Sequence, residues 1–185
     1  TGVPLRSAIL NGDSEKGLNF LGLTKKTKPI LLVMGGSLGA NAINQMIATI
    51  LPELLSKYIV VHSTGPQKSL VPNHPGDYFP YETINAGLAD LYKTADLIIS
   101  RAGASTVCEV LTLEKPAIFI PLPRSQSRGD QIVNCALIKD LPSLMVLDQD
   151  QLTPALLLSQ INTMCQSIKN GYDTEGWSAF SCKHS

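Results

Sequence analysis

Several features that would identify a partner or compartment are absent from this sequence of 185 residues. Its 15 basic and 15 acidic residues give a formal net charge of zero, which argues against a nucleic-acid partner or a polybasic membrane anchor. No apolar run approaches the roughly 18–20 residues of a membrane-spanning helix, and the N-terminus lacks a signal-peptide pattern. We therefore expect a soluble protein that holds any anionic ligand by local geometry, with peripheral membrane contact left open.

Cysteine and histidine are too few and too scattered to suggest a metal centre. The cysteines form no C-x-x-C pair, and the histidines do not cluster near them. We predict reduced thiols, as in a cytoplasmic protein, with no zinc site and no cofactor. The residues concerned are Cys108, Cys135, Cys165, Cys182, His62, His74 and His184.

Six short apolar runs, each too brief for a helix, predict buried strands separated by segments of helical periodicity. This alternation predicts an α/β fold: an open parallel sheet of about six strands with helices on both faces, a Rossmann-like domain. The strands are expected at 30–34, 59–63, 77–81, 97–99, 116–121 and 144–147. The helices are expected at 41–50, with Pro52 limiting or restarting the helix, and at 87–95, 105–113, 130–140 and 153–168.

The two ends of the chain have weaker patterns. Pro4 predicts an extended start, and the lack of an initiator methionine favours an interdomain linker over residues 1–7. An imperfect helical pattern follows over residues 7–23. We predict a single domain over residues 8–170 and an irregular tail over residues 171–185.

The stretch 97–109 combines a strand, a glycine-containing turn and the start of a helix. Free N–H groups at a helix N-terminus attract phosphate, and Gly103 lets a ligand approach the backbone closely. Ser105 and Thr106 add hydroxyl donors, and one turn further on Glu109 could accept both hydroxyls of a ribose. The structural alternative is that Ser105 only caps the helix and Glu109 is a solvated first-turn acid.

Two further loops leave predicted strands at the same end of the sheet. Residues 35–40 form a glycine loop in which Ser37 could donate to a phosphate, although such loops as often serve only a tight turn. The loop 122–129 leads to Asp130 and Gln131, which would meet a polar ligand there. Asp130 also suits a structural N-cap or first-turn position. Ligands of such sheets bind beyond the carboxyl ends of the strands, so the convergence of three loops favours a ligand site.

Four segments together resemble one family of enzymes. They are Thr-Gly-Val-Pro-Leu-Arg at 1–6, Gly-Gly-Ser-Leu-Gly-Ala at 35–40, Arg-Ala-Gly-Ala-Ser-Thr-Val-Cys-Glu at 101–109 and Ser-Arg-Gly-Asp-Gln-Ile-Val-Asn at 127–134. In this order they resemble the MurG family of peptidoglycan glycosyltransferases, which transfer N-acetylglucosamine from UDP-N-acetylglucosamine to lipid I and so form lipid II. The likeness covers residues 1–163 and corresponds to the C-terminal, donor-binding half of a two-domain GT-B enzyme.

The resemblance implies that several of the matching residues meet the donor's diphosphate. Arg6 and Ser37 would contact the diphosphate itself. The helix start at Ala104, Ser105 and Thr106 would lie against the phosphates and the sugar. An inverting transfer needs the charge of the leaving diphosphate stabilised, and fixed amides with an arginine can do this without a metal.

The resemblance also implies roles at the two ends of the donor. Glu109 would hold the ribose hydroxyls, and Gln131 with Asp130 would bind hydroxyls of N-acetylglucosamine. The acceptor site for lipid I, the general base and the membrane-facing patch would lie in an N-terminal half outside this sequence. The resemblance therefore implies a cytoplasmic enzyme, peripheral on the inner face of the membrane, of which this part alone is inactive.

Two parts of the sequence depart from the family pattern. Residues 81–88 replace the family's aromatic-Ile-Asp-Asp-Met-like turn, so no uracil contact is assigned, and the last fifteen residues do not match the family's final helices.

Two other hypotheses about function remain. One alternative is a stand-alone sugar-nucleotide-binding subunit of a split GT-B transferase. The other is a nicotinamide-dependent dehydrogenase, which is weakened because His62, Ser63 and Thr64 stand where an acid is expected. We expect His62 to be a packed residue rather than a catalytic one.

Overall fold

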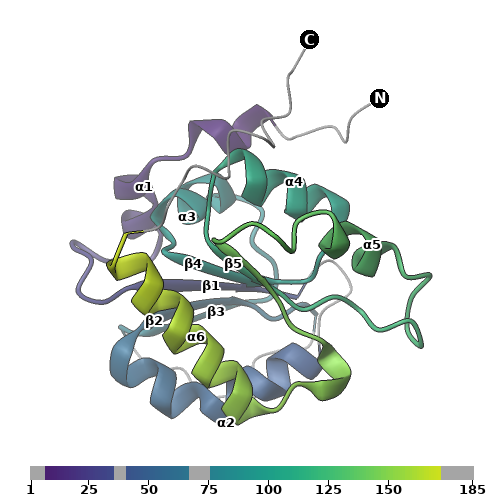
Figure 1. Cartoon of the computed structure of the whole chain (residues 1–185). Helices are drawn as coiled ribbons and strands as arrows, with labels where there is room; N and C mark the ends of the chain where they lie inside the picture. Colours follow the sequence, from purple (N-terminus) through teal and green to yellow (C-terminus); the bar gives the residue numbers. More distant parts are fainter. Residues whose placement is uncertain (1–6, 36–40, 67–75, 172–185) are drawn as a thin grey trace.

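A six-stranded parallel sheet forms the centre of the computed structural model, which describes residues 7–35, 41–66 and 76–171 (Figure 1). The strands are β1 (Ile30–Met34), β2 (Ile59–Ser63), β3 (Tyr78–Tyr81), β4 (Leu97–Ser100), β5 (Ala117–Phe119) and β6 (Leu144–Val146). Their order is β3-β2-β1-β4-β5-β6, and every neighbouring pair is parallel. The predicted fold of about six parallel strands is confirmed.

Helices cover both faces of this sheet, as Figure 1 shows. One face carries α1 (Ser14–Phe20), α3 (Leu88–Thr94), α4 (Ala104–Thr112) and α5 (Asp130–Ala136), and the other carries α2 (Asn41–Lys57) and α6 (Pro154–Lys169). Two short 3-10 helices are η1 (Ser7–Asn11) and η2 (Gln149–Gln151). Within the described ranges, no helix has both the length and the apolar character needed to cross a membrane.

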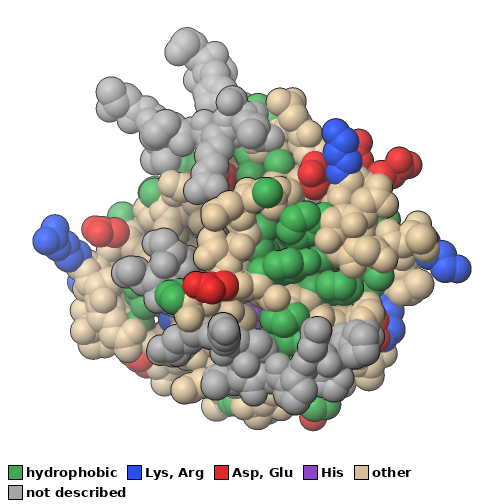
Figure 2. Space-filling model, turned by 180° about the vertical axis from the view of Figure 1, so that it is seen from behind, with side chains coloured by type: hydrophobic (Ala, Val, Ile, Leu, Met, Phe, Trp, Pro, Cys, Tyr) green, Lys and Arg blue, Asp and Glu red, His purple; other side chains and the backbone are tan. Residues whose placement is uncertain are grey.

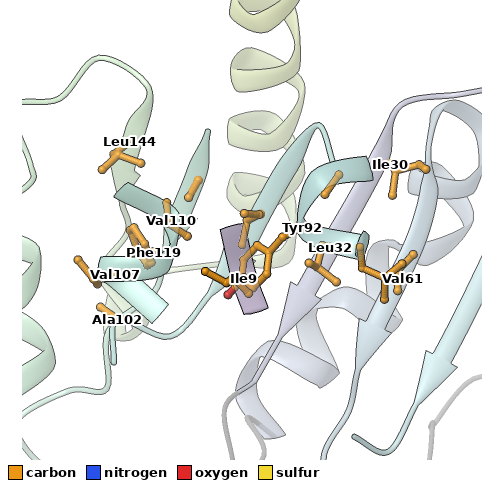
Figure 3. Packing of buried hydrophobic residues seen from close by; sticks show 14 of the residues in the cluster. Ile9, Ile30, Leu32, Val61, Tyr92, Ala102, Val107, Val110, Phe119 and Leu144 are labelled. Carbon is orange, nitrogen blue, oxygen red and sulfur yellow. The ribbon is translucent and has the colours of Figure 1, made fainter. Parts of the chain in front are cut away.

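The strands are buried because alternate residues point into two separate hydrophobic clusters. Leu32 and Phe119 pack with Tyr92 of α3 and Val110 of α4 in the cluster that Figure 3 shows. Leu31, the neighbour of Leu32, belongs to the cluster on the opposite face. Burying a large side chain fully contributes about 1.5–3 kcal/mol, so these apolar runs stabilise the sheet strongly.

The N-terminal segment is not the single imperfect helix predicted over residues 7–23. It forms η1 and then α1, separated at Asp13, whose carboxylate accepts two backbone N–H groups from the first turn of α1. This side chain is an effective N-cap and starts a new helix. Helix α1 packs closely on α3, since a Cβ added at Gly17 would lie 2.0 Å from Thr94 Oγ1.

Two other helices differ in length from the prediction. Helix α2 continues through Pro52 without ending or restarting, because Pro52 is on the exposed side while Leu51 and Leu54 are buried. Helix α5 has only seven residues instead of the eleven expected over 130–140. Beyond it, the N–H groups of residues 137 and 138 bond to carbonyls three residues back rather than four, which ends the α-helical pattern.

A buried polar network fastens the start of α2 to the carboxyl end of β2. The Asn44 amide group donates to the Thr64 carbonyl at 2.8 Å, and its Oδ1 lies 3.0 Å from His62 Nε2. With Oδ1 as the acceptor, His62 carries its proton on Nε2, and Nδ1 accepts from the Tyr78 hydroxyl at 3.1 Å. Burial lowers the pKa of His62 to about 4. His62 is thus a packed, neutral residue, as expected.

This network predicts a pH dependence of stability. The unfolded chain takes up a proton at the ordinary His pKa of about 6.5, whereas folded His62 resists protonation until about pH 4. The free energy of unfolding should therefore fall as the pH drops from 6.5 to 4, by up to about 3 kcal/mol from this group. Urea unfolding across this range measures the effect.

The matched control is His62→Gln, which keeps an amide donor and acceptor but does not titrate. All carboxylates are common to both proteins, so the wild type should lose more stability than His62→Gln between pH 6.5 and pH 4. Parallel losses in the two proteins would contradict the assignment of the neutral histidine.

Candidate functional site

A cavity of about 370 Å³ opens at the carboxyl ends of three neighbouring strands. Its floor includes Met34 from β1, Ser63 from β2 and Ser100 from β4. The chain order reverses between β1 and β4, and such a reversal is where open α/β sheets bind ligands. The sheet topology thus places the cavity where the sequence predicted a ligand site.

The N-terminus of α4 forms one wall of the cavity. The N-cap residue is Gly103, which has no side chain to cap the helix, and Ser105 and Thr106 of the first turn line the cavity. Ser105 is therefore not the cap, and the structural alternative for this residue is wrong. First-turn N–H groups have no intrahelical partners, so the positive end of the helix dipole faces this space.

Glu109 lies one turn further along α4 and also lines the cavity, although it is only 5% exposed. The Tyr92 hydroxyl donates to its Oε2 at 3.0 Å. A buried carboxylate held by a phenol is not a solvated first-turn acid, so that alternative is also wrong. The hydrogen bond fixes the orientation of an acceptor group beside the cavity.

Tyr92 is a site residue that the sequence interpretation missed. Periodicity places it on the buried face of α3, together with Leu88 and Leu91. Its partner Glu109 is 17 residues away on α4. Only the packing of two helices on the same face of the sheet brings them together, and no sequence spacing signals this contact.

Another wall is the loop that follows β3. Glu82, Thr83, Ile84 and Asn85 line the cavity there, and Leu88 of α3 adds an apolar surface. This loop belongs to the segment that departs from the family pattern. The cavity therefore has hydroxyl and backbone donors on one side and a mixed apolar and polar wall on the other.

The predicted site residues divide into four groups. Ser105, Thr106 and Glu109 meet in the cavity. Ala104 begins α4 and is exposed, but it does not line the cavity. Arg6 and Ser37 lie outside the described residues.

Asp130 and Gln131 begin α5 and do not line this cavity. Asp130 is exposed in the first turn, and the N-cap is Gly129, so Asp130 takes the first-turn position and not the cap. Gln131 is half-buried, and its Oε1 accepts the backbone N–H of Leu122 at 3.0 Å. These two residues stand at the exit of β5, next to the loop rather than inside the cavity.

A hydrogen bond connects α5 to the turn that precedes α4. The Asn134 amide group on α5 donates to the Ala102 carbonyl at 2.9 Å. Ala102 lies in the turn between β4 and α4. The position of α5, and of Gln131 with it, is therefore tied to the turn that starts α4.

Charge at the surface is dispersed rather than concentrated. On the face in Figure 2, hydrophobic side chains gather near the centre and most charged side chains lie around the rim. Among residues 7–35, 41–66 and 76–171, no group of three or more His, Cys, Asp or Glu is placed to hold a metal ion. The described donors for an anion at the cavity are backbone amides and hydroxyls.

Comparison with known proteins identifies a family. The model of the glycosyltransferase family 28 C-terminal domain matches residues 30–179. This range includes all six strands of the sheet.

Similar curated proteins carry one enzyme name. The chain is 40% identical over 169 residues to the UDP-N-acetylglucosamine--N-acetylmuramyl-(pentapeptide) pyrophosphoryl-undecaprenol N-acetylglucosamine transferase 2 of Bacillus cereus, covering 90% of this chain and 47% of the relative. A transferase from Lachnoclostridium phytofermentans, with the same name but no numeral, is 40% identical over 172 residues, covering 92% and 48%. The chain thus spans about half the length of the curated relatives it matches.

Solved structures agree with this comparison. Acinetobacter baumannii MurG matches with a TM-score of 0.66 and 30% identity, covering 85% of this chain and 46% of that one. A glycosyltransferase of kitacinnamycin matches with a TM-score of 0.63 at 17% identity, covering 78% and 37%, and supports the fold alone. The Rossmann-like sheet is that of the C-terminal domain of GT-B glycosyltransferases.

Proposed function

The chain belongs to glycosyltransferase family 28, whose C-terminal domain it contains, and we propose that this domain binds UDP-N-acetylglucosamine for transfer to lipid I. The observation that carries the proposal is the shared cavity of the uncapped α4 N-terminus and the buried, oriented Glu109. These groups match the two halves of a nucleoside diphosphate: an anion and a ribose diol.

The diphosphate is assigned to the start of α4. Backbone N–H groups of the first turn, the helix dipole and the hydroxyls of Ser105 and Thr106 all favour an anion there. Arg6 and Ser37 are proposed as further diphosphate contacts, and Ala104 as part of the helix start, on the basis of the family resemblance. Together these donors would stabilise the charge that develops on the leaving diphosphate.

The ribose is assigned to Glu109 and the base to the loop after β3. A carboxylate can accept hydrogen bonds from two neighbouring hydroxyls, and Tyr92 holds that of Glu109 in place. If the phosphates lie at the start of α4 and the ribose one turn later, the base extends toward Ile84 and Leu88. These apolar side chains suit the flat face of a pyrimidine.

The donor sugar is assigned to the start of α5. Gln131 uses its Oε1 within the protein, so its amide NH2 group is the part proposed to donate to a hydroxyl of N-acetylglucosamine. Asp130 is exposed beside it and would accept from another hydroxyl. Selectivity for the sugar would then come from the β5 exit loop, and affinity for the nucleotide from α4.

The proposed reaction is an inverting transfer. A hydroxyl oxygen of lipid I attacks the anomeric carbon, the bond from that carbon to the diphosphate oxygen breaks, and UDP leaves with the electron pair. The hydroxyl proton passes to a general base. We assign the base, the lipid I site and peripheral contact with the inner face of the cell membrane to the part of the relatives that this chain does not span.

The first test is calorimetric titration of the chain with UDP-N-acetylglucosamine, UDP-N-acetylgalactosamine, UDP and NAD. Binding that prefers the gluco epimer over the galacto epimer is expected, with no binding of NAD. Binding of NAD alone would overturn the proposal in favour of a dehydrogenase. If neither of the two UDP-sugars nor UDP binds, the proposal that this domain binds the donor is contradicted.

Glu109→Ala should weaken the binding of UDP itself. Loss of hydrogen bonds to a carboxylate costs about 1.5–3 kcal/mol, which corresponds to roughly 10- to 150-fold in the dissociation constant. Tyr92→Phe, which removes only the orienting hydroxyl, should give a smaller loss in the same direction. The control is Glu53→Ala, because Glu53 is exposed on α2 and does not line the cavity. Unchanged UDP affinity in Glu109→Ala would remove Glu109 from the ribose.

Gln131→Ala should act on the other end of the donor. UDP affinity should remain within about twofold, whereas affinity for UDP-N-acetylglucosamine should fall by about 5- to 10-fold, as expected for one lost hydrogen bond. Gln126→Ala is the control, since Gln126 is an exposed glutamine in the loop that precedes α5. An equal loss for both ligands would show that Gln131 does not contact the sugar.

A further inference from the structure

Arg101 is a buried cation at the end of β4 that the proposed donor contacts do not use. It is 6% exposed, and its guanidinium is bonded to neutral oxygens only. Nη1 donates to the carbonyls of Ile120 at 2.9 Å and Pro121 at 3.3 Å, and Nη2 donates to Gln149 Oε1 at 2.5 Å. In the part of the chain that the structure describes, no carboxylate pairs with it, and its buried Nε has no hydrogen-bond partner.

A buried guanidinium without a carboxylate partner lowers the stability of the folded state. Removing a charge from water costs several kcal/mol unless it is well compensated, and burial lowers the pKa of Arg101 accordingly. A well-packed apolar side chain would fill the same space at a lower cost. What a guanidinium offers instead is a rigid, planar set of donors that holds several acceptors in one fixed arrangement.

The three acceptors belong to the exits of two further strands. Ile120 and Pro121 begin the loop that leaves β5, and Gln149 lies in η2, after β6. The next residue of the β5 loop, Leu122, donates its N–H to Gln131. Arg101 therefore holds the two residues directly before Leu122, and Leu122 is bonded to Gln131, the side chain assigned to the donor sugar.

We infer that Arg101 is a positioning residue for sugar selectivity, which fixes the β5 exit loop and thereby presents Gln131 to the donor. This inference rests on the proposed function. Arg101 acts through the loop and touches neither the nucleotide nor the sugar. Its effect should therefore appear in the advantage of UDP-N-acetylglucosamine over UDP and not in the affinity for UDP.

The test combines Arg101→Met, which keeps an extended side chain without donors, with Gln149→Ala, which removes one of the three acceptors. Arg101→Met should bind UDP within about twofold of wild type but lose about tenfold of the preference for UDP-N-acetylglucosamine over UDP. Gln149→Ala should lose about threefold, and Arg101→Lys, with a single charged donor group, should be intermediate. Gln151→Ala, an exposed neighbour in η2, is the control and should change neither affinity.

A second measurement separates positioning from general destabilisation and needs no ligand. Hydrogen exchange of the backbone amides should accelerate in residues 120–131 of Arg101→Met, while the amides of β1 and β2 keep their wild-type protection. Acceleration over the whole sheet would indicate a merely structural role. An equal loss of UDP and UDP-N-acetylglucosamine affinity would indicate a direct effect on the nucleotide, and either result overturns the inference.

The two proposals fail in different ways. If the wild type binds neither UDP nor UDP-N-acetylglucosamine, the proposed function fails. The exchange measurement still decides whether Arg101 holds the loop. If the wild type binds the donor selectively and Arg101→Met keeps that selectivity, only the positioning role is refuted.

Discussion

The burial of a parallel sheet on both faces is the constraint on which the rest of this structure depends. Helices on each side leave most strand positions to apolar side chains, as the fully buried Ile30, Leu31 and Leu32 illustrate. Ligand chemistry is thus confined to the carboxyl edge, where all parallel strands end together. Ser63, Ser100 and the first turn of α4 line the cavity there, at the reversal of chain order between β1 and β4.

In the described part of the chain, fixed dipoles at this edge face any bound anion, and there is no surface cluster of cations. The N-terminus of α4 follows a glycine cap and is left without a side-chain acceptor. Helix dipoles and backbone amides need no reorganisation when a ligand arrives, because folding has already oriented them. A net charge of zero is therefore compatible with a phosphate site, and recognition depends on geometry more than on long-range attraction.

Sequence periodicity predicted the features that depend on a single strand or helix. It missed the side-chain contacts that join two separate elements. Each β-strand was found from its own apolar run, and Ser105 and Glu109 lie one turn apart on one helix, so their convergence was predictable. The passage of α2 through Pro52 required knowing which side of the helix is exposed. The contact of Tyr92 with Glu109 joins separate helices, and its prediction required the packing of α3 beside α4.

The same distinction applies to the buried positioning groups, each of which joins two separate elements of the fold. His62 with Asn44, Tyr92 with Glu109, and Arg101 all form hydrogen bonds during folding that set the direction of another group. Each is buried, so each carries a desolvation cost that the fold must offset before any ligand is present. A loop held only by its own sequence would sample several conformations and would pay that entropy on binding. Ordering the loops in advance shifts the entropic cost from binding to folding, and a ligand that fits then gains the full strength of each contact.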